Sequence, residues 1–300
     1  MASKIKITFL GTSAQIPTSK RNHTAVLLTY EGENILVDCG EGTQRQFRKT
    51  RLNPCKITRI LITHIHGDHV LGLVGLLETL SVSGYNKTLS IYGPKGIKNF
   101  IEKLLDTFVF KREYKIKIEE VKGKFLETDD FYLEAESMNH RIPCNAYCFV
   151  KKGQIRIDKN KLEKSKLPSG PLIKKLKEGK DIIYNRKKYL AKNLTYEEGG
   201  KKISFVFDTS MNKEIIPFVQ DSDLLICEST FTSNLENRAE AYKHLTAKQA
   251  GEIAKKSKSR KLVLTHISQR DEKNLKTLLN EAKKVFKKSS VAEDFDKIEI

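Results

Sequence analysis

Three histidines and an aspartate within six positions constrain this chain more than any other feature. The segment His64-Ile65-His66-Gly67-Asp68-His69 directly follows the apolar run RILIT, which predicts a strand. At a strand end, His64 and His66 point to the same side, and a turn at Gly67 brings Asp68 and His69 back towards them. Imidazole and carboxylate ligands without thiolate are typical of Zn²⁺ with positions open for water. Two pairs of such ligands predict two metal ions held side by side.

The remaining ligands must come from other strand ends. His140 follows the strand YLEAESMN, Asp208 ends VFD, and His266 follows LVLT. Taken singly, each has an ordinary explanation: a strand-end histidine, a helix N-cap and a packed polar residue. Taken with the cluster, the three residues supply the ligands that two metal ions would still need.

Two pairs of similar segments predict two related β/α halves that face a shared cleft. RILITHIHG at 59–67 resembles RKLVLTHIS at 260–268, and ENILVD at 33–38 resembles ISFVFD at 203–208. Pro94 is expected in the first turn of a helix, where its missing N–H costs nothing. Periodicity predicts strands at 4–10, 24–30, 34–38, 57–63, 88–92, 115–121, 131–137, 145–150, 202–207, 223–227 and 261–265, and helices at 72–80, 94–110, 246–256 and 272–287.

Positive charge is concentrated in one segment. The net charge is +18, and residues 151–192 hold 15 Lys and Arg against 4 Asp and Glu. Such a block interrupts the strand pattern and favours an inserted basic arm for a polyanionic partner, although a solvated surface insertion or a lysine-rich, heat-adapted composition would also give positive charge. The arm is expected to contain two lysine-rich helical stretches around its Pro-Gly centre.

The expected location is the cytoplasm, without membrane contact. No apolar run reaches the 18 or more residues that a membrane helix needs, and the N-terminus has no signal-peptide pattern. Five scattered cysteines, an odd number, predict reduced thiols.

The histidine cluster with the later His, Asp and His resembles the metallo-β-lactamase superfamily. The resemblance implies an α/β fold, a four-layer αββα sandwich, as a single domain over residues 1–300 with the arm at 151–192 inserted. It implies two Zn²⁺ per subunit. By resemblance, His64, His66 and His140 bind one ion, Asp68, His69 and His266 bind the second, Asp208 bridges them, and Asp38 in ILVDCGEG supports the ligands from outside.

Other stretches resemble one family within that superfamily, ribonuclease Z. The segment Gly11-Thr12-Ser13 followed by Pro17–Asn22 resembles the start of that family, with Lys20, Arg21 and Asn22 as donors to phosphate, although a polar turn would look the same. YKHLT resembles its His-x-Ser/Thr motif and points to His244, with Glu228 as the group that orients it. Gly170-Pro171 resembles the centre of the family's flexible arm, which binds tRNA.

The resemblance implies a zinc-dependent endoribonuclease that removes the 3′ trailer from precursor tRNA, leaving a tRNA 3′-OH and a 5′-phosphorylated trailer. Water is the expected nucleophile, with Asp68 accepting or orienting its proton and His244 as acid for the leaving oxygen. A homodimer is implied, in which one subunit's arm grips the tRNA cut by the other. Two alternatives stay open: a small-molecule hydrolase of thioesterase or lactamase type, and a non-catalytic RNA-binding protein.

Overall fold

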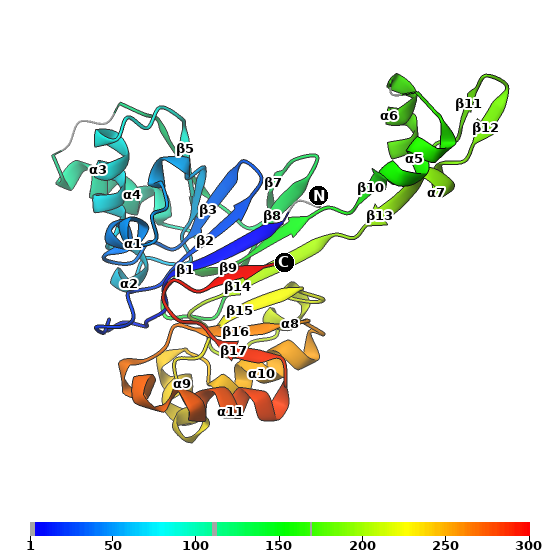
Figure 1. Cartoon of the computed structure of the whole chain (residues 1–300). Helices are drawn as coiled ribbons and strands as arrows, with labels where there is room; N and C mark the ends of the chain where they lie inside the picture. The colour runs from blue at the N-terminus through cyan, green and yellow to red at the C-terminus, as the bar shows by residue number, and fades with distance from the viewer. Residues whose placement is uncertain (1–3, 110–112, 169) are drawn as a thin grey trace. The chain divides into compact units, whose positions relative to one another are not determined.

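The computed structural model describes residues 4–109, 113–168 and 170–300 (Figure 1). The chain divides into two compact units. The larger comprises residues 1–126, 133–149 and 202–300, and the smaller comprises residues 127–132 and 150–201. The last residue of the expected helix 94–110 lies outside the described residues, as does Ser169 in the centre of the arm.

The first sheet of the larger unit is built from strands within residues 5–120 and one strand at the C-terminal end of the chain. Among the described residues it has seven strands in the order β18-β1-β2-β3-β4-β5-β6. Strands β3 to β6 run parallel, while β18, β1, β2 and β3 pair antiparallel. The bounds are β1 Ile5–Gly11, β2 Ala25–Tyr30, β3 Glu33–Val37, β4 Arg59–Leu61, β5 Leu89–Gly93, β6 Ile116–Glu120 and β18 Lys297–Glu299.

The second sheet, built from strands within residues 123–291, has a matching arrangement. Its order is β17-β16-β15-β14-β9-β8-β7, and β14 to β17 run parallel, as β3 to β6 do in the first sheet. The two-fold relation predicted from the paired segments is therefore visible in the topology. The bounds are β7 Gly123–Glu127, β8 Phe131–Met138, β9 Cys144–Lys151, β14 Lys201–Val206, β15 Leu224–Glu228, β16 Leu262–Thr265 and β17 Ser289–Val291.

The two sheets pack face to face, with helices on their outer faces (Figure 1). Between the sheets, the rings of Tyr30 and Phe149 meet edge to face with centroids 5.5 Å apart, and the Tyr147 hydroxyl donates to the Ile62 carbonyl over 2.7 Å. One outer core joins the first sheet to α1 (Thr43–Lys49), α3 (Leu73–Val82) and α4 (Ile97–Thr107). Another joins the second sheet to α8 (Ile215–Phe218), α10 (Ala247–Lys256) and α11 (Leu275–Val285). Each fully buried aliphatic or Phe side chain contributes roughly 1.5–3 kcal/mol. The expected α/β four-layer architecture is confirmed.

Helices α3, α4, α10 and α11 of the larger unit agree with the four expected segments except at their ends, whereas α1, α2, α8 and α9 were not expected. Helix α10 begins after the N-cap Thr246, whose side chain forms a capping box with Gln249. Pro94 does not open a helix; α4 begins at Ile97 after Gly96, whose φ of 96° suits glycine. The bounds are α1 Thr43–Lys49, α2 Gly67–Val70, α3 Leu73–Val82, α4 Ile97–Thr107, α8 Ile215–Phe218, α9 Glu236–Tyr242, α10 Ala247–Lys256 and α11 Leu275–Val285, with short 3₁₀ turns η1 Pro54–Lys56, η2 Ser233–Leu235 and η3 Gln269–Asn274.

The smaller unit has its own apolar cluster. Leu167, Leu176, Ile182, Ala191 and Leu194 are buried together in it. Two of its helices, α5 and α6, were expected, but α7 and the hairpin β11-β12 were not. The bounds are β10 Gln154–Ile157, α5 Lys159–Ser165, α6 Pro171–Lys177, β11 Ile182–Tyr184, β12 Lys187–Tyr189, α7 Ala191–Leu194 and β13 Thr195–Glu198, and β10 pairs antiparallel with β13.

Two further observations concern membrane-spanning helices and the cysteines. Over the described residues, no helix is both long enough and apolar enough to cross a membrane. The five cysteines, all among the described residues, form no disulfide with one another.

Three residues just beyond parallel strands have left-handed backbone conformations. Asp38 after β3, Asp208 after β14 and His266 after β16 have φ of 58°, 38° and 57°. Such conformations cost about 1–3 kcal/mol for a non-glycine residue and cluster at functional sites. All three turn the chain sharply where the carboxyl ends of the strands meet, and so direct their side chains to one place.

Candidate metal centre and active site

The first group of possible ligands gathers around one oxygen of Asp208. His64 Nε2 lies 3.0 Å from His66 Nδ1, and His140 Nε2 lies 3.2 Å from the same atom. Asp208 Oδ2 is 3.5 Å from His64 Nε2 and 3.9 Å from His140 Nε2. The ligand atoms of this group all lie within 4.8 Å of one another.

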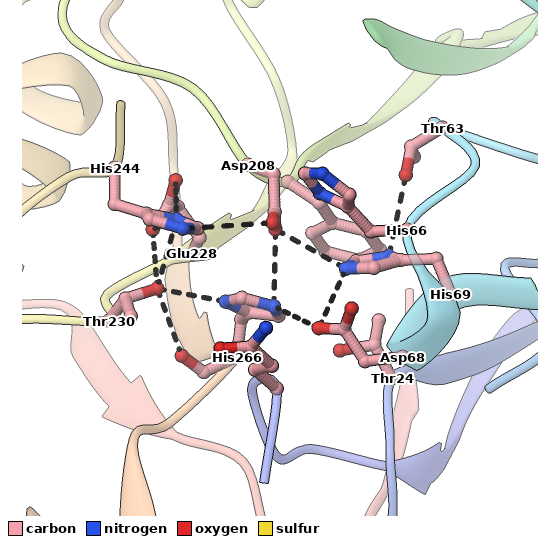
Figure 2. Close-up of polar contacts among 12 residues, drawn as sticks. Thr24, Thr63, His66, Asp68, His69, Asp208, Glu228, Thr230, His244 and His266 are labelled. Carbon is pink, nitrogen blue, oxygen red and sulfur yellow. Dashed lines mark hydrogen bonds and ion pairs between the residues drawn. The ribbon is translucent and has the colours of Figure 1, made fainter. Parts of the chain in front are cut away.

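The second group gathers around the other oxygen of Asp208. Asp208 Oδ1 lies 3.5 Å from His69 Nε2 and 3.2 Å from His266 Nε2. Asp68 Oδ2 lies 3.3 Å and 3.4 Å from the same two nitrogens. Figure 2 shows Asp208 between His244 and His69, with His266 and Asp68 beside it. The seven residues expected as ligands therefore come together in two groups that share Asp208.

The atoms of the second group are short of hydrogen-bond partners. His69 Nε2 and Asp208 Oδ1 are buried, and neither forms a hydrogen bond with the described residues. Burial would lower the pKa of His69, but the carboxylates of Asp208, Asp68 and Asp38 raise it well above its usual value. Two buried ligand atoms without a hydrogen-bond partner, surrounded by carboxylates, leave a position that a cation would occupy. The residues therefore fit metal ions.

The first group presents neutral imidazoles. Burial lowers the pKa of His64, His66 and His140, the first of them furthest. Neutral imidazole is the form that donates a lone pair to a metal. The Nδ1–H of His140 donates to the Lys243 carbonyl over 3.0 Å, so its Nε2 is left to face the group.

Asp38 supports the histidines from outside both groups. Its Oδ2 accepts from His69 Nδ1 over 2.7 Å and from the Thr63 hydroxyl over 2.8 Å, and its Oδ1 accepts from the Thr63 N–H over 2.7 Å. The Thr63 oxygen lies 3.1 Å from His64 Nδ1. These hydrogen bonds fix the tautomers that leave Nε2 of His64 and of His69 facing the ligand groups.

Glu228, Thr230 and His244 form a second supporting network. The Thr230 hydroxyl donates to Glu228 Oε2 over 2.6 Å and its oxygen lies 2.8 Å from His266 Nδ1. Glu228 Oε2 lies 3.1 Å from His244 Nδ1, and Asp208 Oδ2 lies 3.9 Å from His244 Nε2. Burial lowers the pKa of His244, but Glu228 and Asp208 outweigh it and raise the pKa to about 9. These two carboxylates thus favour the protonated form of the His244 imidazole.

Thr63 and Thr230 were missed in the sequence, although both lie in segments that were examined. Each follows a parallel strand and bridges a buried carboxylate to a histidine. The available signal was the repeated strand-Thr-His pattern for Thr63 and the position two residues after Glu228 for Thr230. A threonine at a strand end is too common to stand out without the fold.

A cavity of about 470 Å³ opens over the two ligand groups. The carboxylates among its described lining residues are Asp68 and Asp208, which belong to those groups. Its wall also contains three arginines and two aromatic side chains. These are Arg141, Arg238, Arg270, Phe231 and Tyr242.

The expected phosphate donors of the Pro17–Asn22 segment lie outside this cavity lining. Lys20 is exposed, whereas the Arg21 guanidinium is buried and its Nη1 donates to the Thr12 hydroxyl and the Ala292 carbonyl over 2.7 and 2.6 Å. The Asn22 amide donates to the Glu41 carbonyl over 2.7 Å. Arg21 and Asn22 thus fasten the segment that carries Lys20, and RNA contact by all three stays a prediction.

In the smaller unit, Gly170 is the N-cap of α6 and Pro171 occupies its first turn. Their contact with tRNA also stays a prediction.

Known proteins resemble the chain over its whole length. Ribonuclease Z of Nanoarchaeum equitans is 38% identical over 295 residues, covering 98% of this chain and 92% of the relative. Ribonuclease Z of Oceanobacillus iheyensis is 38% identical over 308 residues, covering 99% and 100%. The solved structure of human tRNase Z, short form, aligns with a TM-score of 0.72 at 28% identity over 98% of both chains.

Two further matches concern the fold. The metallo-β-lactamase fold protein YhfI from Bacillus subtilis aligns with a TM-score of 0.73 at 20% identity, over 99% of this chain and 100% of that one. A family model described as the anti-Pycsar protein Apyc1 matches residues 5–132, a stretch that includes the segment His64–His69.

The two facing sheets with outer helices and the double histidine–carboxylate group define a protein of the metallo-β-lactamase fold with a candidate metal centre. Full-length relatives narrow this class. The chain belongs to the ribonuclease Z family, whose members are metal-dependent endoribonucleases that process the 3′ ends of tRNA. Membership confirms the resemblance seen in the sequence motifs. It favours the endoribonuclease over the two alternatives, a small-molecule hydrolase and a non-catalytic RNA-binding protein.

Proposed function

We propose that this chain removes the 3′ trailer of precursor tRNA with two Zn²⁺ per subunit. The arrangement of ligand atoms around the two oxygens of Asp208 carries the proposal. One ion would be held by His64, His66 and His140, the other by Asp68, His69 and His266, with Asp208 bridging them. When bound, the ions would polarise the scissile phosphate and make water nucleophilic at neutral pH.

Asp68 is positioned to accept or orient the proton of the attacking water. Its carboxylate lines the cavity and is held by His69 and His266. Burial would raise the pKa of Asp68, but these histidines outweigh it, so the side chain is a carboxylate that accepts a hydrogen bond from the water. Water, and not the ribose 2′-OH, is the nucleophile, and the trailer would carry a 5′-phosphate.

His244 would act as the acid for the leaving 3′-oxygen of the tRNA. It lines the cavity, and its Nε2 faces the shared Asp208, whereas its Nδ1 is held by Glu228. A protonated imidazole with one nitrogen anchored and the other directed into the cavity has the geometry of a general acid. Glu228 is fully buried and acts through His244 by orienting it and keeping it charged.

The basic arm at 151–192 would bind the body of the tRNA, with Gly170 and Pro171 at its centre. A net positive segment tracks a phosphate backbone without reading bases. We place the protein in the cytoplasm as a homodimer, in which the arm of one subunit grips the tRNA cut by the other. Light scattering with and without precursor tRNA tests the dimer.

One assay tests reaction and metal together. Purified protein is incubated with 5′-labelled precursor tRNA carrying a 3′ trailer, with and without a chelator, followed by addition of zinc. We expect a single chelator-sensitive cut near the acceptor stem that leaves a 3′-OH, and its restoration by zinc at two ions per subunit. An intact precursor, or a 2′,3′-cyclic phosphate product, would contradict the proposed substrate or mechanism.

A further inference from the structure

One part of the cavity wall is not used by the proposed mechanism. Tyr242, the last residue of α9, is half exposed at the cavity, and the Arg141 guanidinium lies over its ring at 4.8 Å from the centroid. The Tyr242 ring is nearly parallel to that of Phe231, with an interplanar angle of 20° and centroids 6.4 Å apart. Phe231 itself is buried and lies under Arg270.

Hydrogen bonds from two side chains to the backbone around Tyr242 hold the pair of Arg141 and Tyr242 beside the first ligand group. Arg141 Nη2 donates to the Ala241 carbonyl over 3.0 Å, and Nδ1 of the neighbouring His140 donates to the Lys243 carbonyl over 3.0 Å. Two hydrogen bonds thus join positions 140–141 to the turn at 241–243. The pair is therefore held at a fixed place beside His140, a residue of the first ligand group.

The chemistry of this pair suits an unpaired nucleotide. Aromatic rings and guanidinium planes both stack on nucleobases, and a guanidinium also pairs with a phosphate. The contact with Ala241 occupies one of the five N–H donors of Arg141, which leaves donors for an anion. A small substrate would need no such surface beyond the reacting phosphate.

We propose that Arg141 and Tyr242 form a stacking subsite for the base of the last tRNA nucleotide, the one that carries the leaving 3′-oxygen. The choice of nucleotide rests on the proposed role of His244 as acid. Tyr242 precedes His244 by two residues, and the Phe231 ring beside Tyr242 lies 6.1 Å from the His244 ring. In an in-line displacement the attacking water and the leaving oxygen lie on opposite sides of the phosphorus, so the subsite is on the leaving side.

The test combines protein variants with abasic substrates. Tyr242→Ala and a precursor tRNA that lacks the last tRNA base should each lower kcat/KM by roughly 5- to 100-fold. Together they should lower it no further than either alone, because each removes the same contact. Arg141→Ala should show the same coupling, whereas Tyr242→Phe keeps the ring and should remain close to the wild-type rate.

The controls separate this subsite from the proposed function. The Phe295 ring is also exposed and has the Lys49 ammonium over it, but Phe295 does not belong to the cavity lining. Phe295→Ala should therefore leave kcat/KM unchanged. The subsite would be overturned if the losses in kcat/KM from the variant and from the abasic substrate multiply, or if the variant couples to an abasic first trailer nucleotide instead. Cleavage of the intact precursor by the wild type would still support the proposed function in either case. Failure of the wild type to cut the intact precursor would overturn the proposed function itself.

Discussion

His69 Nδ1 lies 2.7 Å from Asp38 Oδ2, and both side chains are completely buried. This hydrogen bond directs the other nitrogen of His69 at Asp208 and Asp68. Asp38→Asn should weaken zinc binding by about 10- to 100-fold, because the histidine loses a charged partner that fixes its tautomer. Competition with a chelator measures the dissociation constant.

Asparagine is the suitable replacement for Asp38, because it tolerates the left-handed backbone better than alanine does. Asp221 offers a matched control, since it is exposed and also has a positive φ, of 55°. Asp221→Asn should leave zinc affinity unchanged. An unchanged affinity in Asp38→Asn as well would remove Asp38 from the support of the metal centre.

Asp208→Asn should disable both ligand groups at once, since its two oxygens face different histidines. We expect zinc content to fall and hydrolysis of both precursor tRNA and bis(p-nitrophenyl) phosphate to slow on the order of 10³-fold, equivalent to several kcal/mol of activation free energy. Metal analysis and both rates are measured on the same preparation. Two zinc ions per subunit and an undiminished rate would show that Asp208 does not bridge them.

His244→Ala should separate two substrates by their leaving groups. Loss of a general acid lowers the rate by about 10²- to 10⁴-fold where the leaving oxygen needs a proton, as the tRNA 3′-oxygen does. The p-nitrophenolate ion leaves without one, so hydrolysis of bis(p-nitrophenyl) phosphate should change little. Glu228→Gln should show the same pattern to a smaller extent. Equal losses on both substrates would assign His244 to the metal centre or to folding instead.

Deletion of the arm should damage binding of tRNA but spare the chemistry. Ile157 and Thr195 are paired at the ends of β10 and β13, so a short glycine-containing turn can replace residues 158–194. We expect cleavage of precursor tRNA to fall by about tenfold or more, with a weaker dependence on salt, since fewer phosphates are contacted. Hydrolysis of bis(p-nitrophenyl) phosphate should persist.

A milder variant controls for damage caused by the deletion. Lys174, Lys175 and Lys177 lie on α6, and their replacement by glutamine removes charge but keeps the helix. This variant should reduce the salt dependence in the same direction. Equal loss of both activities after the deletion would contradict a separate binding role for the arm.

Much of the site could be predicted from the types and spacing of residues that are close in the sequence. The segment His64–His69 has a ligand spacing that few structures other than a metal site require, and Asp208 and His266 each end or follow an apolar run that predicts a strand. Strand ends, apolar alternation and the capping signal at Thr246 depend on neighbouring residues alone. The repeated strand patterns predicted two related halves, whereas the four-layer architecture was implied by the resemblance to the metallo-β-lactamase superfamily.

Tertiary structure decided what depends on residues distant in the sequence. The Arg21 guanidinium, for example, is buried against the Ala292 carbonyl, 271 positions away in the sequence. Thr230 gained its role from His266 and Glu228, which β15 and β16 bring together only because they pair in parallel. The sequence alone therefore determined the ligand types and the strands that carry them. The fold decided which side chains support those ligands, since hydrogen bonding depends on distance in space.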